Sequence, residues 1–246
     1  MSEAATARAP ATRRRVVWRL VRLAWLAGYG LFILLPVTLI SIYEVAAPPI
    51  TPLMVIRAIG GEGLSRDWVD IEDMGQAAPR SVIASEDNHF CEHWGFDWGE
   101  LTRVIDETDD DRPRRGGSTI TQQTAKNLFL WPNRSYVRKA IEAYVTLMME
   151  LMLDKRRILE LYLNEIEFGP GIYGIEAAAQ HYFKKPAAKL SAREAGLLAA
   201  ILPNPRKLSA DKPGPKTSRK ANTIVTRTQQ LGPLFDCVPE IAWTKR

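Results

Sequence analysis

The chain is poor in cysteine and histidine, with two cysteines and three histidines among 246 residues. Cys91 and Cys237 lie far apart, which excludes a disulfide framework and a cysteine-rich zinc module. Bridges between sparse cysteines are uncommon, so we favour free thiols, although the two could pair in an oxidising compartment and the sequence leaves this open. Convincing strand patterns are few and repeats are absent. A hydrophobic content of 46% still provides a substantial core and excludes a disordered or fibrous protein.

Charge is absent from residues 24–43, AWLAGYGLFILLPVTLISIY. A run of this length matches a hydrocarbon core of about 30 Å at about 1.5 Å per helical residue. Before it come many arginines and a single acid, Glu3, so the positive-inside rule places the N-terminus in the cytoplasm. The alternative is a signal peptide cleaved near Val45-Ala46-Ala47, but the apolar run is longer than the roughly 7–15 residues usual there.

These features predict a single-pass protein of a cytoplasmic (inner) membrane. We expect a basic cytoplasmic tail over 1–23, a transmembrane helix over 24–43, a linker over 44–64 and an extracytoplasmic, periplasmic domain over 65–246. The basic residues concentrate before the span, so nucleic-acid binding has little support. A substrate carried in the same membrane would lie within reach of the domain.

Helical patterns dominate residues 65–246, and we expect one mainly α-helical domain. Capping signals delimit several helices: Asp97 with Glu100, Ser118, Asp154 as a break, and Ser191 with Glu194. The expected helices cover 79–90, 97–106, 118–129, 135–164 with the break, a segment ending at 183, 191–202 and 217–231. Glycines 169, 171 and 174 indicate a loop.

A dense polar cluster over residues 85–97, SEDNHFCEHWGFD, follows an apolar helical turn. Charge is costly to bury without partners, so the cluster is a candidate site. Glu86 could serve as a base in sugar chemistry. Alternatively, His89, Glu92 and His93 fit the H-x-x-E-H zinc-peptidase pattern, which requires a continuous helix.

A second candidate feature is an anion site that begins at Gly116-Gly117-Ser118. Glycines let the backbone approach a ligand, and the helix start that follows presents free N–H groups. Lys126 lies two turns along that helix and Arg134 lies just beyond it, which suits a phosphate or diphosphate; ordinary surface cations are the simpler interpretation. Arg138 and Glu142 are neighbours on one helix face, either as a surface pair or as a half-buried carboxylate with cations.

Taken in order, these segments resemble the glycosyltransferase family 51 of peptidoglycan glycosyltransferases. Glu86-Asp87-x-x-Phe90-x-x-His93-x-Gly95-x-Asp97 is similar to the first family signature. The second to fourth signatures correspond to GGSTITQQ-x-x-KN (116–127), RK-x-x-EA (138–143) and ILE-x-YLN (158–164). The resemblance covers about residues 65–230, and the ordered set is far more specific than any single motif.

The resemblance implies a lysozyme-like, two-lobed helical glycosyltransferase domain that polymerises lipid II into β-1,4 glycan strands with release of undecaprenyl diphosphate. It implies Glu86 as general base and Glu142 as a second functional carboxylate. The substrate-binding residues it implies are Asp87, Gly116, Ser118, Gln123, Lys126, Arg134, Arg138 and Lys139. The expected partners are lipid II, the growing strand, membrane lipids, and wall-synthesis or division proteins.

We expect no required cofactor and no protein-bound metal. Stimulation by Mg or Mn is left open, because the acids over 106–111 could attract a divalent ion, although a solvated loop is the simpler interpretation. Two other functions remain as rivals to polymerisation. A lytic enzyme would transfer to water and would need no diphosphate clamp, and a non-catalytic scaffold would need neither carboxylate.

Overall fold

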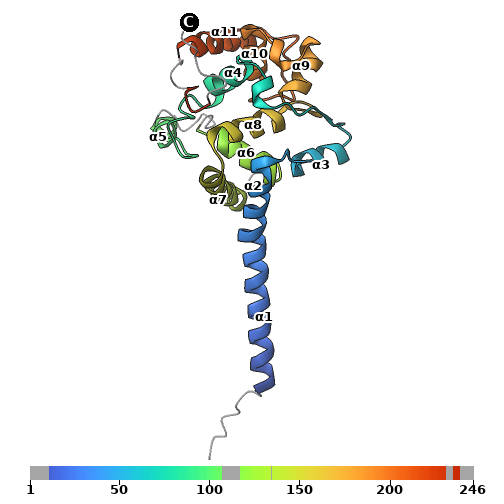
Figure 1. Cartoon of the computed structure of the whole chain (residues 1–246), viewed down its shortest axis with the longest axis vertical. Coiled ribbons are helices and arrows are strands. Elements are labelled where there is room, and N and C mark those ends of the chain that lie inside the picture. The colour runs from blue at the N-terminus through green and yellow to red at the C-terminus, as the bar shows by residue number, and fades with distance from the viewer. Residues whose placement is uncertain (1–10, 107–116, 134, 231–234, 239–246) are drawn as a thin grey trace, which may run out of the picture.

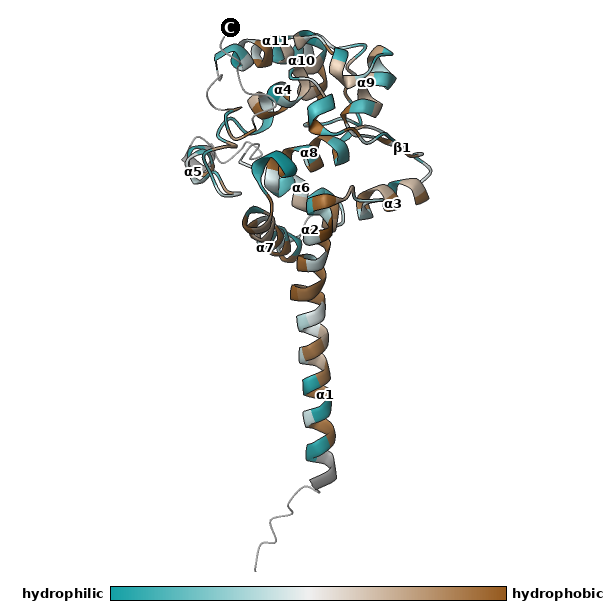
Figure 2. Cartoon of the chain, in the orientation of Figure 1, coloured by the Kyte–Doolittle hydropathy of each residue, from teal (hydrophilic) through white to brown (hydrophobic). Residues whose placement is uncertain are grey.

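The computed structural model describes residues 11–106, 117–133, 135–230 and 235–238. It consists of a helical head on a long helical stem (Figure 1). The stem runs through α1 (Ala11–Tyr29), a π-helical turn (Gly30–Leu34) and α2 (Leu35–Val45). Within the described chain, one helical stretch is long and apolar enough to cross a membrane: Arg14–Val45, with 32 residues. It fits a single-pass anchor, with its hydrophilic residues at the end remote from the head (Figure 2).

The upper end of the stem is built into the head. Ile40 is fully buried, and the ring of Tyr43 lies 6.0 Å from that of Phe129. Arg157 donates from Nε to the Tyr43 carbonyl at 2.7 Å and from Nη2 to the Ala46 carbonyl at 2.8 Å, satisfying carbonyls at the helix end. The stem therefore fixes the orientation of the head relative to any membrane that the stem crosses.

The segment expected as a linker contains a helix, α3 (Pro52–Ile59). Thr51 caps it by accepting a hydrogen bond from the Met54 N–H at 3.3 Å, and Pro52 occupies the first helical position, where no N–H is needed. Three prolines and two glycines in residues 46–62 favour a loop, but the Thr-Pro pair is a helix start. The description of residues 44–64 as linker alone is therefore wrong.

The head is mainly helical, as the sequence predicts. Its α-helices after α3 are α4 (Ala77–Glu86), α5 (Trp98–Asp106), α6 (Ile120–Phe129), α7 (Tyr136–Met152), α8 (Lys155–Glu165), α9 (Ile175–Phe183), α10 (Ala192–Ile201) and α11 (Pro215–Gln230). Two short 3₁₀ turns cover Ile71–Asp73 and Ala187–Lys189. Three short strands, β1 (Ser65–Arg66), β2 (Glu167–Gly169) and β3 (Ile172–Tyr173), form a sheet in the order β1-β3-β2, parallel for β1-β3 and antiparallel for β3-β2.

Three local expectations are corrected. The glycine-rich loop is a hairpin, β2-β3, in which Gly171 adopts a φ of +71° and a Cβ would lie 2.0 Å from the Glu62 carbonyl oxygen. Helix α4 ends at Glu86 rather than at residue 90, because Asp87 leaves the helical region with φ −163°. The cap of α6 is Thr119 and not Ser118.

The head has two lobes, which meet around α8. One lobe packs α4 against α10 and α11, and the other packs α6 against α7 (Figure 1). The core is continuous through both lobes and includes fully buried Phe90, Ile83, Met149 and Phe168. Glu86 ends a helix of the first lobe, whereas Lys126 and Glu142 lie on helices of the second. The lobe junction is therefore where the predicted site residues can meet.

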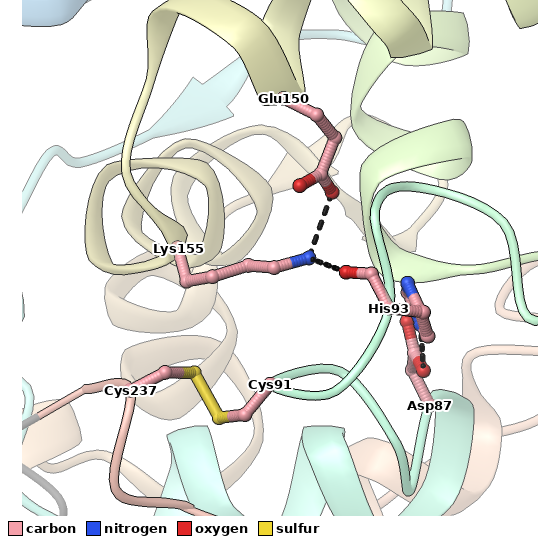
Figure 3. Close-up of a disulfide and its surroundings, with 6 residues drawn as sticks. All are labelled: Asp87, Cys91, His93, Glu150, Lys155 and Cys237. Carbon is pink, nitrogen blue, oxygen red and sulfur yellow. Dashed lines mark hydrogen bonds and ion pairs between the residues drawn. A yellow bond between two sulfur atoms is a disulfide. The ribbon is translucent and has the colours of Figure 1, made fainter.

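Cys91 and Cys237 form a disulfide, contrary to the free thiols that we favoured. Their Cα atoms lie 5.4 Å apart across a sequence separation of 146 (Figure 3). The bridge ties the loop after α4 to the end of the described chain, where Phe235 and Val238 are fully buried. Sequence spacing carries no signal for such a pair, because only the tertiary fold brings the two thiols together.

Candidate active site

The Glu86 carboxylate lies at the lobe junction with neutral hydrogen-bond donors. The Ser85 hydroxyl donates to Oε1 at 3.0 Å, and the Gln123 amide donates from Nε2 to Oε2 at 3.2 Å. Among the described residues, the Lys220 ammonium of α11 forms a long ion pair with Oε1 at 4.0 Å. The side chain is 13% exposed and lines a cavity of about 640 Å³, so one face of the carboxylate is open to a ligand.

The orientation of the Gln123 amide is set by Tyr162. The buried Tyr162 hydroxyl donates to Gln123 Oε1 at 3.2 Å, which turns the amide NH₂ group toward Glu86. Burial, followed by the charges of Glu86 and Asp87, raises the pKa of Tyr162 well above its usual value. The hydroxyl therefore remains a donor, and Glu86 must accept from Gln123.

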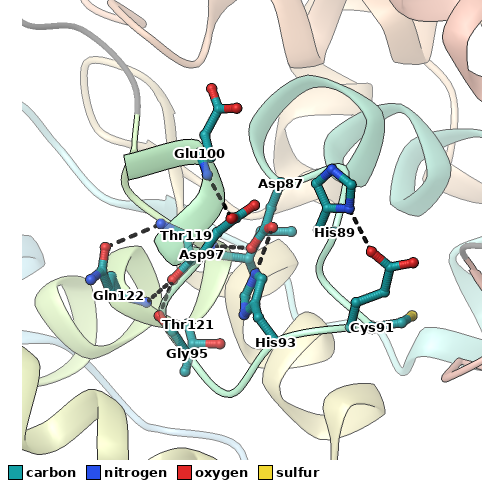
Figure 4. Close-up of polar contacts among 12 residues, drawn as sticks. Asp87, His89, Cys91, His93, Gly95, Asp97, Glu100, Thr119, Thr121 and Gln122 are labelled. Carbon is teal, nitrogen blue, oxygen red and sulfur yellow. Dashed lines mark hydrogen bonds and ion pairs between the residues drawn. The ribbon is translucent and has the colours of Figure 1, made fainter. Parts of the chain in front are cut away.

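Asp87 supports the site from behind. Its side chain is only 2% exposed, with Oδ1 2.8 Å from His93 Nε2 and Oδ2 accepting from the Ile120 N–H at 2.9 Å (Figure 4). A carboxylate at a helix start is stabilised by the free N–H groups and the helix dipole. Both oxygens are used within the protein, so the structure favours a positioning role over the substrate contact predicted for Asp87.

The loop between α4 and α5 is fixed onto α6 by a second set of bonds. Thr119 and Gln122 form a reciprocal capping box, and the Thr119 hydroxyl donates to the Gly95 carbonyl at 2.6 Å (Figure 4). Gly95 has a φ of +75°, and a Cβ there would meet Thr146 Cγ2 at 2.7 Å. Any other residue at position 95 would therefore separate this loop from α7.

The same loop is also held by a buried ion pair between Lys155 and Glu150. Lys155 Nζ donates to Glu150 Oε1 at 2.8 Å and to the His93 carbonyl at 2.7 Å, and the Thr121 hydroxyl donates to Glu150 at 2.6 Å (Figure 3). His93, Gly95 and the helix cap Asp97 thus act as structural supports of the loop.

The zinc alternative is not supported by this geometry. Residues 88–95 form turns and bends rather than the continuous helix that the zinc pattern requires. The His89 ring bonds to Glu92, whereas the His93 ring bonds to Asp87, so the two rings have different carboxylate partners. Across the described ranges, no three histidine, cysteine or carboxylate side chains are grouped so that they could hold a metal ion.

Lys126 lies at the boundary of two cavities. With Ser118 and Gln123 it lines both the Glu86 cavity and an adjoining cavity of about 810 Å³ that contains Glu142. Burial lowers the pKa of Lys126, and the Glu142 carboxylate offsets part of that shift. In the part of the chain that the structure describes, its ammonium has no hydrogen-bond or ion-pair partner. A half-buried, unpaired cation in a cleft is an anion-binding group.

Glu142 has the opposite environment to Glu86. Its side chain is 5% exposed and lies between Arg138, whose Nη1 is 2.8 Å from Oε2, and the Lys139 ammonium, which bonds to Oε1. Arg138 is itself buried and Lys139 is half exposed. The carboxylate holds both cations at the wall of the larger cavity, where they lie beside Lys126.

The structure therefore brings together most of the predicted site. Gly116 and Arg134 lie outside the described residues, as do residues 107–111 of the acidic loop. Lys220, Ser85 and Tyr162 are site residues that the sequence analysis missed. No local pattern distinguishes Lys220 from other helix cations; only the packing of α11 on α4 places it near Glu86.

Comparison with known proteins identifies the family to which the chain belongs. The sequence profile of the transglycosylase family matches residues 54–229. The chain belongs to the transglycosylase family. The matched range contains Glu86, Lys126, Glu142 and Lys220, and it follows the stem. The chain is thus a glycosyltransferase, and the family assignment made from the sequence is confirmed.

Several relatives of this transglycosylase carry the name biosynthetic peptidoglycan transglycosylase. The Caulobacter vibrioides protein is 47% identical over 91% of this chain and 99% of its own length. The Rhodopseudomonas palustris protein is 50% identical over 91% of this chain and 92% of its own. The Brucella suis protein is 48% identical over 83% of this chain and 92% of its own.

Proposed function

We propose that this transglycosylase polymerises lipid II into β-1,4 glycan strands with release of undecaprenyl diphosphate, in cell wall biosynthesis. The observation that carries the proposal is that one cleft is lined by an accessible carboxylate, Glu86, and by a half-buried cation, Lys126, which has no partner among the described residues. The relatives named above carry peptidoglycan in their names, which supports the same substrate class.

The proposed reaction requires a base on one side of the sugar and a stabilised leaving group on the other. Glu86 accepts the proton of the acceptor 4-hydroxyl as that oxygen attacks C1 of the donor sugar. The C1–O bond to the lipid diphosphate breaks, the electron pair leaves with the diphosphate, and the configuration at C1 is inverted from α to β. No proton is needed by the leaving group, because a diphosphate is already a stable anion.

Charge stabilisation falls to the cations of the larger cavity. Lys126, Arg138 and Lys139 face that cavity, with Glu142 as the counter-ion that orients two of them. Preorganised cations in a partly dehydrated cleft stabilise developing negative charge without reorganisation. We propose that they make a cofactor unnecessary; assays with added Mg²⁺ or Mn²⁺ and with chelator test this.

The substrate is a lipid, and the shape of the protein supports membrane delivery. Helices α3 and α7 lie near the end of the stem that joins the head (Figure 1). Both carry exposed apolar side chains, among them Ile59, Val137 and Leu151. Exposed apolar groups beside an anchor are favoured against a bilayer. We propose an inner-membrane location with the arginine-rich end in the cytoplasm and the head outside.

Incubation of fluorescent lipid II with the full chain in detergent tests the proposal. Long, muramidase-sensitive strands and free undecaprenyl diphosphate are the expected products. Shortening of preformed glycan strands, without consumption of lipid II, would instead favour the lytic alternative. A protein that binds lipid II and neither lengthens nor shortens strands would be a scaffold.

A further inference from the structure

Two tryptophans, one within the first signature and one directly after it, are exposed without a structural reason. Trp94 and Trp98 are 67% and 68% exposed, and the Phe96 ring stacks on that of Trp98 at 5.5 Å with an angle of 24° between the planes. We call Trp94, Phe96 and Trp98 the aromatic shelf. Large aromatic side chains left in water are unfavourable, and clustered ones mark an interaction surface.

The aromatic shelf lines a cavity of its own, of about 640 Å³, together with polar side chains. His89, Asp97, Glu100 and Arg103 line both this cavity and the cavity of Glu86. The two spaces are therefore neighbours with a shared wall, and the shelf begins where the candidate active site ends.

The shelf is rigidly supported. Gly95, between Trp94 and Phe96, is held by the Thr119 hydroxyl at 2.6 Å, and Asp97 accepts from the Glu100 N–H at 2.8 Å to start α5. Because these bonds already fix the loop, a ligand on the shelf would pay little to order it.

The chemistry of the rim selects among occupants. A sugar ring has an apolar face of C–H groups, which stacks on an aromatic ring, and hydroxyl edges, which bond to carboxylates, imidazole and guanidinium. A lipid tail would gain nothing from that charged rim. In addition, α5 lies at the side of the head, whereas α3 and α7 flank the stem (Figure 1).

We propose that the aromatic shelf binds the sugar chain of the substrate, on the N-acetylated sugars that extend beyond the reacting residue. The proposal rests on the proposed function, because only a glycan-transferring site presents such a chain next to Glu86. The shelf would hold a strand through successive transfers and so favour long products.

The experiment uses the full chain in detergent and a soluble tetrasaccharide of alternating N-acetylglucosamine and N-acetylmuramic acid. Calorimetric titration should show that the double variant Trp94→Ala/Trp98→Ala binds this probe about tenfold more weakly, since each aromatic stack contributes modestly. Trp98→Phe should retain most of the affinity. Trp131→Ala removes an exposed tryptophan outside the shelf and should leave the affinity unchanged. Thermal melting checks that each variant is folded.

The second readout is strand length from lipid II, which should fall in the double variant. Unchanged tetrasaccharide affinity in a folded double variant would overturn the proposal. Binding of the double variant to liposomes is measured as well: if it lost liposome binding and kept tetrasaccharide binding, the shelf would be a membrane contact and the proposal would be wrong. Wild-type protein that binds the tetrasaccharide but does not polymerise lipid II would refute the proposed function while leaving the shelf a glycan site. Wild-type protein that polymerises lipid II but does not bind the tetrasaccharide would support the proposed function and refute the shelf as a glycan site.

Discussion

The two carboxylates of the cleft differ in what surrounds them. Glu86 is held by a hydroxyl and an amide, with the Lys220 ammonium 4.0 Å away, whereas Glu142 is bonded to Arg138 and Lys139. A carboxylate bonded to neutral groups keeps an uncompensated charge that can take a proton. One enclosed by cations is a counter-ion that fixes their positions. On this ground we propose that Glu86 takes the proton and that Glu142 holds the cations in place.

Replacing Glu86 tests the first half of this comparison and should have the largest effect. Glu86→Gln keeps the size of the side chain but cannot accept the proton, so the rate of lipid II polymerisation should fall by about 10²–10⁴-fold. The initial rate at saturating lipid II is the measurement. Glu72→Gln alters a half-exposed carboxylate away from the cleft and should keep the wild-type rate.

Lys126 should have the next largest effect, because its ammonium has no partner within the described structure. Lys126→Gln removes the cation between the two cavities, and we expect a rate about 10²–10³-fold lower. The loss should be accompanied by weaker inhibition by added undecaprenyl diphosphate. Lys126→Arg restores the charge and should recover part of the rate. Equal polymerisation rates for Lys126→Gln and Lys126→Arg would argue against an electrostatic role.

Glu142→Gln should lower activity less, by about 10–100-fold, through misplaced cations rather than a lost base. KM for lipid II and the inhibition constant of the lipid diphosphate should both rise. If kcat alone fell, as expected for Glu86→Gln, the difference between the two carboxylates would disappear.

Asp87→Asn should act mainly on stability. The side chain is 2% exposed and bonded to His93 and to the start of α6, so loss of the charged bonds should cost about 1.5–3 kcal/mol. A lower melting temperature with activity recovered on cooling is the expected result. Loss of activity at an unchanged melting temperature would restore the substrate contact predicted from the sequence.

The remaining prediction concerns the dependence of stability on pH. Burial raises the pKa of Glu165 from 4.5 to about 7, although Arg66 partly offsets this. Between those values the folded state binds more protons than the unfolded state, so stability should fall as pH rises from 4.5 to 7, by roughly 3 kcal/mol at most. Glu165→Gln removes the titration, and its melting temperature should vary less over that range. An equally steep decline in the variant would contradict this.

Local signals account for much of what the sequence predicted. Asp154, Ser191 and Asp97 cap helices where expected, because a cap depends on residues only three positions away. At the α6 cap, Ser118 and Thr119 are both capable, and the choice is made by the Gly95 carbonyl, which only the Thr119 hydroxyl reaches. Here tertiary structure decides what local sequence leaves open.

The site divides in the same way. Glu86, Lys126 and Glu142 lie in recognisable motifs, so their convergence could be expected. Lys220 and the Cys91–Cys237 bridge could not, since each depends on contacts across more than a hundred residues. Asp87 lies in a motif, yet the sequence could not predict its hydrogen bonds to His93 and to the Ile120 N–H. A motif shows which residues matter, and the fold shows what each one does.

The most direct test compares Glu86→Gln and Glu142→Gln side by side for turnover of lipid II and for binding of undecaprenyl diphosphate. The account predicts that Glu86→Gln loses turnover and keeps near wild-type binding, whereas Glu142→Gln loses binding and keeps part of its turnover at high substrate concentration. Near-normal polymerisation by Glu86→Gln, or equal loss of binding in both variants, would contradict it.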